Sequence, residues 1–179
     1  MKKLLVLLPI LLIGAACAPK AAEKLDPVDI DEAYSIKITR ENCGLTTDDS
    51  TSEITTNLKA LEDESIEYSF KVGSPAYQHG TYDEFVLKES SYIKSNSNYV
   101  VDRLIVEFYG PSVKFAVYNN TEGTGDELVY HESSTASEHP DDGGVVYDYG
   151  IGGKDWMIKN VSAPQKAAFY SITVIFTLE

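Results

Sequence analysis

The last twelve residues of the chain alternate between apolar and polar side chains with a period of two. In 168–179 the even positions from Tyr170 to Leu178 are all apolar, whereas three of the odd positions are Ser or Thr. Successive side chains of an extended strand point to opposite faces of a sheet. The pattern therefore predicts a β-strand with one buried face, and it disfavours an amphipathic helix.

Shorter runs of the same kind recur along the chain, separated by Gly, Asn, Asp and Ser. In 99–110, Leu104 and Val106 share one face with Val100. The next alternating run, 113–117, follows a Gly-Pro break, and we expect it to pair with 99–110 as a hairpin. Further predicted strands are 34–40, 66–72, 83–88, 127–132, 144–150 and 155–160.

Many short strands without a βαβ rhythm predict an all-β fold, an antiparallel β-sandwich of the jelly-roll kind. One segment departs from this pattern. Near 52–62, Ile54, Leu58 and Leu61 recur at helical spacing, and Ser52 is a suitable N-cap. We therefore expect one short helix there.

The chain begins with the features of an export signal. Lys2 and Lys3 precede the uncharged run 4–14, which is shorter than the roughly 20 apolar residues that span a bilayer as a helix. Small residues then lead to Cys17. This arrangement resembles a bacterial lipoprotein signal, in which the cysteine becomes the first mature residue and carries acyl chains such as palmitate; Gly14 stands where Leu is usual. Plain secretion is the alternative to lipidation of Cys17, and both place the protein outside the cytoplasm.

Behind the signal peptide, 1–17, we expect a flexible tether over 18–32 and a single β-sandwich domain over 33–179. Loss of the signal changes the net charge from −13 to −15, because Lys2 and Lys3 are removed. Such an acidic chain is repelled by nucleic-acid phosphates and by anionic membrane surfaces. The predicted membrane attachment is therefore the lipid anchor alone. Cys43 is the remaining cysteine, and we interpret it as a buried core residue rather than a nucleophile.

Four stretches of the chain share a texture of short strands and turns: 38-ITRENCGLTT-47, 80-GTYDEFVLKESSYIKS-95, 103-RLIVEFYG-110 with 113-VKFAVYNN-120, and 156-WMIKNVSAPQKAAFYSITVIF-176. Together they resemble a β-sandwich module found on exported proteins and lipoproteins of Firmicutes and Mollicutes. In those proteins the module occurs alone or joined to enzymes such as secreted nucleases. The resemblance implies a β-sandwich accessory or binding domain, and it carries no established ligand set or catalytic residues to this chain.

The chain is rich in aromatic residues, with twelve Tyr, six Phe and one Trp. Tyr77, Tyr82 and Tyr92 surround a turn-rich stretch that also contains Asp83. Tyrosine rings can stack on sugar rings while neighbouring polar groups bind the hydroxyls, so these residues and Trp156 form a predicted carbohydrate site. The alternatives are that the tyrosines cover half-buried strand faces and that Trp156 fills the core.

Metal binding and catalysis have weaker signals. Pairs of carboxylates in predicted turns suit a structural Ca²⁺, although the pattern does not name its ligands, and plain surface charge is the alternative. These pairs are Asp48-Asp49, Asp83-Glu84 and Asp141-Asp142. Histidines occur at His79, His131 and His139, but neither G-x-S-x-G nor H-E-x-x-H is present. We therefore expect no enzyme.

Together these features predict an exported, membrane-anchored lipoprotein at the cell surface. Its sandwich is expected to present an aromatic and acidic face to a carbohydrate or cell-wall polymer. The main alternative is a protein–protein interaction or assembly component that uses an edge strand or the loop 132–144. A histidine-dependent hydrolase ranks third.

Overall fold

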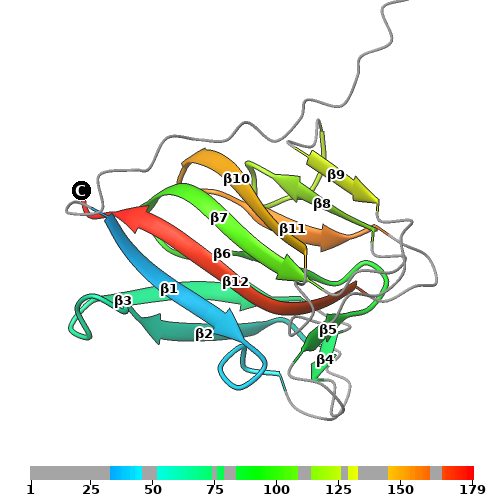
Figure 1. The fold of residues 1–179 in the computed structure, drawn as a ribbon, viewed down its shortest axis with the longest axis horizontal. Coiled ribbons are helices and arrows are strands. Elements are labelled where there is room, and N and C mark those ends of the chain that lie inside the picture. Colours follow the sequence, from blue (N-terminus) through cyan, green and yellow to red (C-terminus); the bar gives the residue numbers. More distant parts are fainter. Residues whose placement is uncertain are drawn as a thin grey trace, which may run out of the picture.

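The computed structural model describes residues 33–45, 52–73, 76–78, 84–108, 114–125, 129–132, 145–161 and 167–179. This part of the chain is all-β: twelve strands form two six-stranded sheets in which every paired strand is antiparallel (Figure 1). The predicted fold class, an antiparallel β-sandwich, is confirmed. The predicted signal and tether lie outside the described residues.

The first sheet is built around β12 (Ala167–Thr177). On one side β12 pairs with β7 (Val100–Phe108), and β7 in turn pairs with β10 (Val145–Gly153) at the edge of the described sheet. On the other side of β12, one strand pairs with its C-terminal part and a second strand pairs with its N-terminal part. A third, short strand extends the sheet from the second strand. These are β1 (Ala33–Thr39), β5 (Phe85–Leu87) and β4 (Ala76–Gln78).

The second sheet has the order β2-β3-β6-β11-β8-β9. Its strands are β2 (Ile54–Lys59), β3 (Glu67–Val72), β6 (Tyr92–Ser95), β11 (Met157–Asn160), β8 (Lys114–Tyr118) and β9 (Val129–Glu132). Most connections along the chain cross from one sheet to the other, so strands that follow each other are rarely paired.

This crossing makes the predicted hairpin of 99–110 with 113–117 wrong. Both runs are strands, but β7 lies in the first sheet and β8 in the second. Apolar alternation shows that each strand buries one face in the core, and it does not show which strand lies beside it. The two strands face each other across the core, where the rings of Phe108 and Phe115 make an edge-to-face contact with their centroids 5.2 Å apart.

The helix predicted near 52–62 is also wrong, because this segment forms β2. Residues that recur at positions i and i+4 fit a strand as well as a helix. Ile54, Thr56 and Leu58 share the partly buried face of β2, and the residues between them are exposed. The run of Ile and Thr supplies β-branched side chains that favour an extended backbone. β4 was not predicted, and β6 was implied only by the family resemblance.

Two strands depart from the alternation expected of them, and a β-bulge explains each case. The register between β12 and β7 shifts between Phe169 and Ser171, so that Phe169 rather than Tyr170 joins the core cluster. A second shift near the start of β7 places Val101 in the core, where the sequence suggested Val100.

The core lies between the two sheets and is dominated by aromatic rings. At one end, Phe176 of β12 lies 4.9 Å from the ring of Tyr68 on β3 and 5.1 Å from the ring of Tyr99. At the other end, Phe115 of β8 lies 5.3 Å from Phe169 of β12. These ring contacts join the two sheets along the length of the sandwich.

Trp156 belongs to this core and does not lie on the surface. Its side chain is fully buried, and its Nε1 donates a hydrogen bond of 2.9 Å to the Tyr68 hydroxyl. That hydroxyl also shares a hydrogen bond with the Ser95 hydroxyl, at 3.3 Å. Trp156 is therefore wrong as a ligand platform, and the core alternative holds. Cys43 is buried as predicted, and burial raises the pKa of its thiol.

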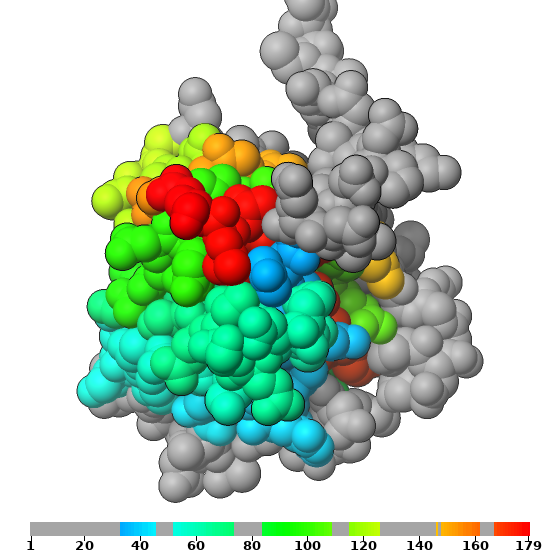
Figure 2. Space-filling model, turned by 90° about the vertical axis from the view of Figure 1, so that its left-hand side faces the viewer, coloured from blue at the N-terminus to red at the C-terminus, as the bar shows by residue number. Residues whose placement is uncertain are grey.

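The turn between β2 and β3 closes one side of the sandwich. The backbone N–H of Leu61 donates to the carbonyl of Ser35 at 2.8 Å, and the Glu62 carboxylate accepts bonds of 2.7 Å from both the backbone N–H and the hydroxyl of Ser35. Figure 2 shows this hairpin lying against the start of β1 and close to the C-terminal residues. The second sheet is thereby attached to the first by hydrogen bonds as well as by the core.

We predict that Tyr68→Phe lowers the free energy of unfolding by about 1–3 kcal/mol, because it leaves the buried indole N–H of Trp156 without an acceptor. Urea unfolding followed by circular dichroism measures this change. Ser95→Ala is the matched control: it removes the outer member of the chain of hydrogen bonds and keeps the bond between Trp156 and Tyr68, so we expect a smaller loss. Equal losses in both variants would contradict this assignment.

Candidate functional site

The five predicted ligand-binding residues do not come together in one described site. Tyr82 and Asp83 lie outside the described residues. Tyr77 pairs through its backbone with Val86, and its side chain is not described. With Trp156 in the core, Tyr92 is the one that the structure places on a described surface.

Tyr92 lies on the outer face of the second sheet. Side chains of β6 alternate, so that Ile93 and Ser95 are buried inward whereas Tyr92 and Lys94 are only partly buried. Antiparallel pairing with β11 sets Tyr92 opposite Lys159 and Lys94 opposite Met157. Two neighbouring strands therefore present an aromatic ring, a thioether and two ammonium groups on one face.

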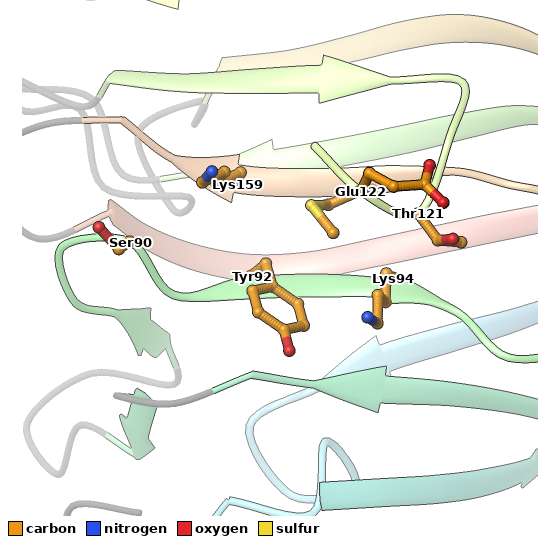
Figure 3. Close-up of a pocket in the computed structure, with 7 residues that line it drawn as sticks. Ser90, Tyr92, Lys94, Thr121, Glu122 and Lys159 are labelled. Carbon is orange, nitrogen blue, oxygen red and sulfur yellow. The ribbon is translucent and has the colours of Figure 1, made fainter. Parts of the chain in front are cut away.

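These side chains surround a hollow of about 520 Å³ on the outer face, shown in Figure 3. β6 and β11 form the base of the hollow, and the turn 119–125 that follows β8 forms one of its walls. Besides Met157, the lining residues are Ser90, Tyr92, Lys94, Thr121, Glu122 and Lys159. The volume is in the range of pockets that bind small ligands.

The turn 119–125 is shaped by one asparagine and one glycine. The Asn120 side-chain oxygen accepts hydrogen bonds from the backbone N–H groups of Glu122 and Gly123, and its amide donates to the Thr124 carbonyl. Gly123 has a φ of +60°, and a Cβ there would lie 2.5 Å from the sulfur of Met157. Only glycine allows this turn to approach the strand so closely. The turn is thus positioned against the apolar outer cluster of Ala116, Tyr118 and Met157.

The ring of Tyr92 is held in place from below and from its far end. Its hydroxyl donates a hydrogen bond of 2.7 Å to Oε2 of Glu53. The ring lies directly over Gly73, where a Cβ would come within 2.1 Å of the ring carbons. A larger residue at position 73 would displace the ring from this position, and the hydrogen bond to Glu53 fixes its direction.

Glu53 is the centre of a small charged network. Its carboxylate accepts a bond of 2.7 Å from Lys71 Nζ and lies 3.2 Å from Lys94 Nζ. The hydrogen bond from Lys71, followed by that from Tyr92, lowers the pKa of Glu53 to about 2. Burial and the neighbouring carboxylate raise the pKa of Tyr92 to about 12. At neutral pH the phenol is therefore neutral and Glu53 is ionised.

The lining of the hollow combines an aromatic ring, hydroxyl groups, two ammonium groups and one carboxylate. Lys94 also lies over the Tyr92 ring, with Nζ 4.9 Å from the ring centroid. The sequence predicted an aromatic and acidic face, but Lys94 and Lys159 give this surface a mixed charge. Such a surface suits an amphipathic ligand that carries hydroxyls or an anionic group.

The other predicted chemistry falls largely outside the described residues. Within the part that the structure describes, no group of three His, Cys, Asp or Glu side chains is placed to hold a metal ion. Of the predicted Ca²⁺ residues, only Glu84 is described, and it is buried. His131 lies in β9 with its side chain not described, whereas His79, His139 and most of the loop 132–144 are outside the described ranges.

No helix in the described residues is long and apolar enough to cross a membrane. The sequence matches no protein-family profile, and no curated protein matches it. The resemblance to the Firmicutes and Mollicutes module therefore stays a prediction.

The sequence analysis did not select Lys94, Lys159, Ser90 or Glu53. A local signal existed for one of them, because Lys94, like Tyr92, alternates with buried residues in the short strand β6. No local signal connects Tyr92 with Lys159 or with Glu53, because those pairs form through sheet pairing between distant segments.

We predict that Glu53→Gln lowers the free energy of unfolding at pH 7 by about 1 kcal/mol, because it removes the charge that binds Lys71 and Lys94. The ordinary pKa of this group is 4.5 and its folded value is about 2. Its stabilising contribution is therefore complete above pH 4.5 and is lost as the pH falls toward 2.

Unfolding measured from pH 7 to pH 2 should show the wild type and Glu53→Gln converging over this window. Glu64→Gln, at an exposed position in the turn after β2, is the control and should match the wild type throughout. A stability difference between Glu53→Gln and the wild type that persists unchanged to pH 2 would contradict the role of the ionised carboxylate.

Proposed function

We propose that this protein is an exported, membrane-anchored lipoprotein whose β-sandwich is a non-catalytic binding module for carbohydrate or a cell-wall polymer. The pattern of residues 1–17 supports export and lipidation at Cys17. The hollow on the second sheet supports ligand binding. The observation that carries the proposal is the Tyr92 ring, fixed by Glu53 and Gly73 inside a hollow lined by hydroxyl and ammonium groups.

This arrangement complements the chemistry of a sugar. A pyranose ring has apolar C–H faces that pack on an aromatic ring, and hydroxyls at its edge that need hydrogen-bond partners. Tyr92 supplies the ring, while Ser90, Thr121 and the two lysines supply the polar groups. Because Glu53 and Gly73 restrain the ring before any ligand arrives, little conformational entropy is lost on binding.

The lining of the hollow favours binding over cleavage of a glycan. Hydrolysis of a glycosidic bond by the common mechanisms uses a pair of carboxyl groups that flank the bond. Glu122 is the one carboxylate among the described residues that line the hollow. This observation supports a non-catalytic role for this surface.

A protein partner at the cell surface is the second candidate, and one observation favours it. β10 forms the edge of the first sheet in the described part of the chain, and Val146 on it is 58 % exposed. An exposed edge strand with apolar side chains can pair with a strand of another protein. Val146→Lys would weaken the binding of such a partner and leave glycan binding unchanged.

Replacement of Tyr92 tests the glycan proposal. We expect Tyr92→Ala to weaken binding of the full chain to its best glycan or cell-wall polymer by about fivefold, because a ring contact contributes on the order of 1 kcal/mol. Tyr92→Phe is the matched control: it loses the bond to Glu53 and keeps the ring, so it should bind nearly as well as the wild type. Isothermal titration calorimetry measures both.

A folded wild-type protein that binds no member of a broad panel of glycans and cell-wall polymers would remove the carbohydrate proposal. Binding that is equally weak in Tyr92→Ala and Tyr92→Phe would place the effect in the network of Glu53 rather than in ring stacking. The result for Val146→Lys then decides whether a protein partner replaces the glycan.

Membrane attachment has its own test. We expect Cys17→Ala to move the protein from the membrane fraction to the soluble exported fraction, because the acyl chains supply the attachment and the acidic domain adds none. Cell fractionation with immunodetection measures the shift. Cys43→Ala is the control and should stay in the membrane fraction. Unchanged membrane association of Cys17→Ala would contradict the lipid anchor.

A further inference from the structure

Positive charge gathers on the outer face of the second sheet although the chain carries a net charge of −13. Lys71, Lys94 and Lys159 come from the adjacent strands β3, β6 and β11. Lys71 and Lys94 share the single carboxylate of Glu53, with Nζ–Oε distances of 2.7 and 3.2 Å. Two positive charges thus face one negative charge on this side of the hollow.

Lys159 differs from these two lysines because no carboxylate among the described residues pairs with it. Its side chain is only partly exposed, lines the hollow and lies opposite Tyr92 in the sheet register. A partly desolvated ammonium group without a partner is unfavourable, and an anion of the ligand would satisfy it with a charge-assisted hydrogen bond. Among the described residues, Lys159 thus contributes a positive charge to the hollow that no neighbouring carboxylate neutralises.

The two ends of the hollow have opposite character. The backbone N–H of Ser90 donates to the carbonyl of Asn160 at 3.3 Å, which places Ser90 at the end of β11 that follows Lys159. Figure 3 shows Lys159 toward the Ser90 end, whereas Glu122 and Thr121 lie at the other end, near Lys94. Lys159 and Ser90 therefore line the end of the hollow that lies away from Glu122, the one carboxylate among the described lining residues.

Ser90 also has an unusual backbone. Its φ is +64°, a left-handed value that costs energy for a residue with a side chain. Strain of this kind concentrates at binding sites, where it holds a side chain in a required position. Here it belongs to the turn that carries the Ser90 side chain to the edge of the hollow.

The net charge of the whole protein does not prevent an anion from binding at this end. At physiological ionic strength the Debye length is about 8 Å, so exposed acids farther away than this are largely screened. The groups in direct contact with a ligand decide its local electrostatic energy, and at the Ser90 end these include a positive charge and a hydroxyl donor.

We infer that the ligand of this hollow is an anionic glycan, with its carboxylate or phosphate group bound by Lys159 and Ser90 and the adjoining sugar ring lying on Tyr92. This inference rests on the proposed glycan-binding function and specifies its ligand class. Glu122 at the opposite end repels a second anionic group, so the residue next to the charged sugar is neutral. Carboxylate and phosphate share the acceptor chemistry that the Lys159 end requires.

The test compares three probes on the full chain, purified in mild detergent: an oligogalacturonate for the carboxylate, a poly(glycerol phosphate) for the phosphate, and a neutral glucan of similar length. We expect one of the two anionic probes to bind at least tenfold more tightly than the glucan, since one charge-assisted bond contributes on that scale. Which anionic probe binds more tightly identifies the source of the charge.

Two variants with opposite expected effects on anion binding extend the test. Lys159→Gln should weaken binding of the preferred anionic probe by about tenfold, and Glu122→Gln should strengthen it a few-fold, because the first removes an attraction and the second a repulsion. The matched controls are Lys37→Gln and Glu41→Gln, at exposed positions in and after β1 in the other sheet, and they should leave every affinity unchanged.

The results distinguish failure of the anionic-ligand inference from failure of the proposed glycan-binding function. Should the glucan bind as tightly as the anionic probes, with Lys159→Gln silent and Tyr92→Ala strongly weakened, the anionic inference is overturned and the glycan-binding function stands. Absence of binding to all three probes and to the broader glycan panel, by a wild type with an intact circular dichroism spectrum, overturns both.

Discussion

The rest of the sandwich depends on the packing of the Phe176 ring between the two sheets. This ring lies within 6.2 Å of those of Tyr34, Tyr68 and Tyr99, so the C-terminal strand brings together β1, β3 and the segment before β7. β12 is also the strand that pairs directly with β1, β5 and β7. A fully buried phenylalanine contributes about 1.5–3 kcal/mol through removal of its surface from water. The C-terminal strand thus connects segments from distant parts of the chain, and the first sheet is complete only when β12 is in place.

The inner face of the second sheet is buried in this core, and the hollow lies on its outer face. The turn 119–125 packs on a small outer cluster that includes Met157, and this arrangement creates the wall of the hollow. The ring of Tyr92 is positioned by Glu53 and Gly73, which lie near the ends of neighbouring segments of the same sheet. The core and the proposed binding surface therefore use opposite faces of one sheet, so the residues that line the hollow are largely separate from those that form the core.

Much of the fold was predictable from local patterns, and the errors have a common cause. Most strands were located by alternation alone, but the segment 52–62 was assigned to a helix because Ile54 and Leu58 fit both periods. The predicted hairpin of 99–110 with 113–117 failed because apolar alternation marks a buried face without naming the neighbouring strand. In the site, Tyr92 was selected by composition and local context, whereas Trp156 was placed in the core by a hydrogen bond to Tyr68, 88 positions away.

The sequence by itself determined the all-β class, the burial of one face in most strands and the expectation of an export signal, because each of these is written in short-range periodicity and composition. Only the tertiary structure decided that Lys159 lies opposite Tyr92 and that Glu53 accepts the hydrogen bond of the same tyrosine, across 39 positions. These contacts follow from the order and register of the strands. That order is set by packing the whole core at once, since the free energy that selects a strand's neighbours is shared among residues from every part of the chain.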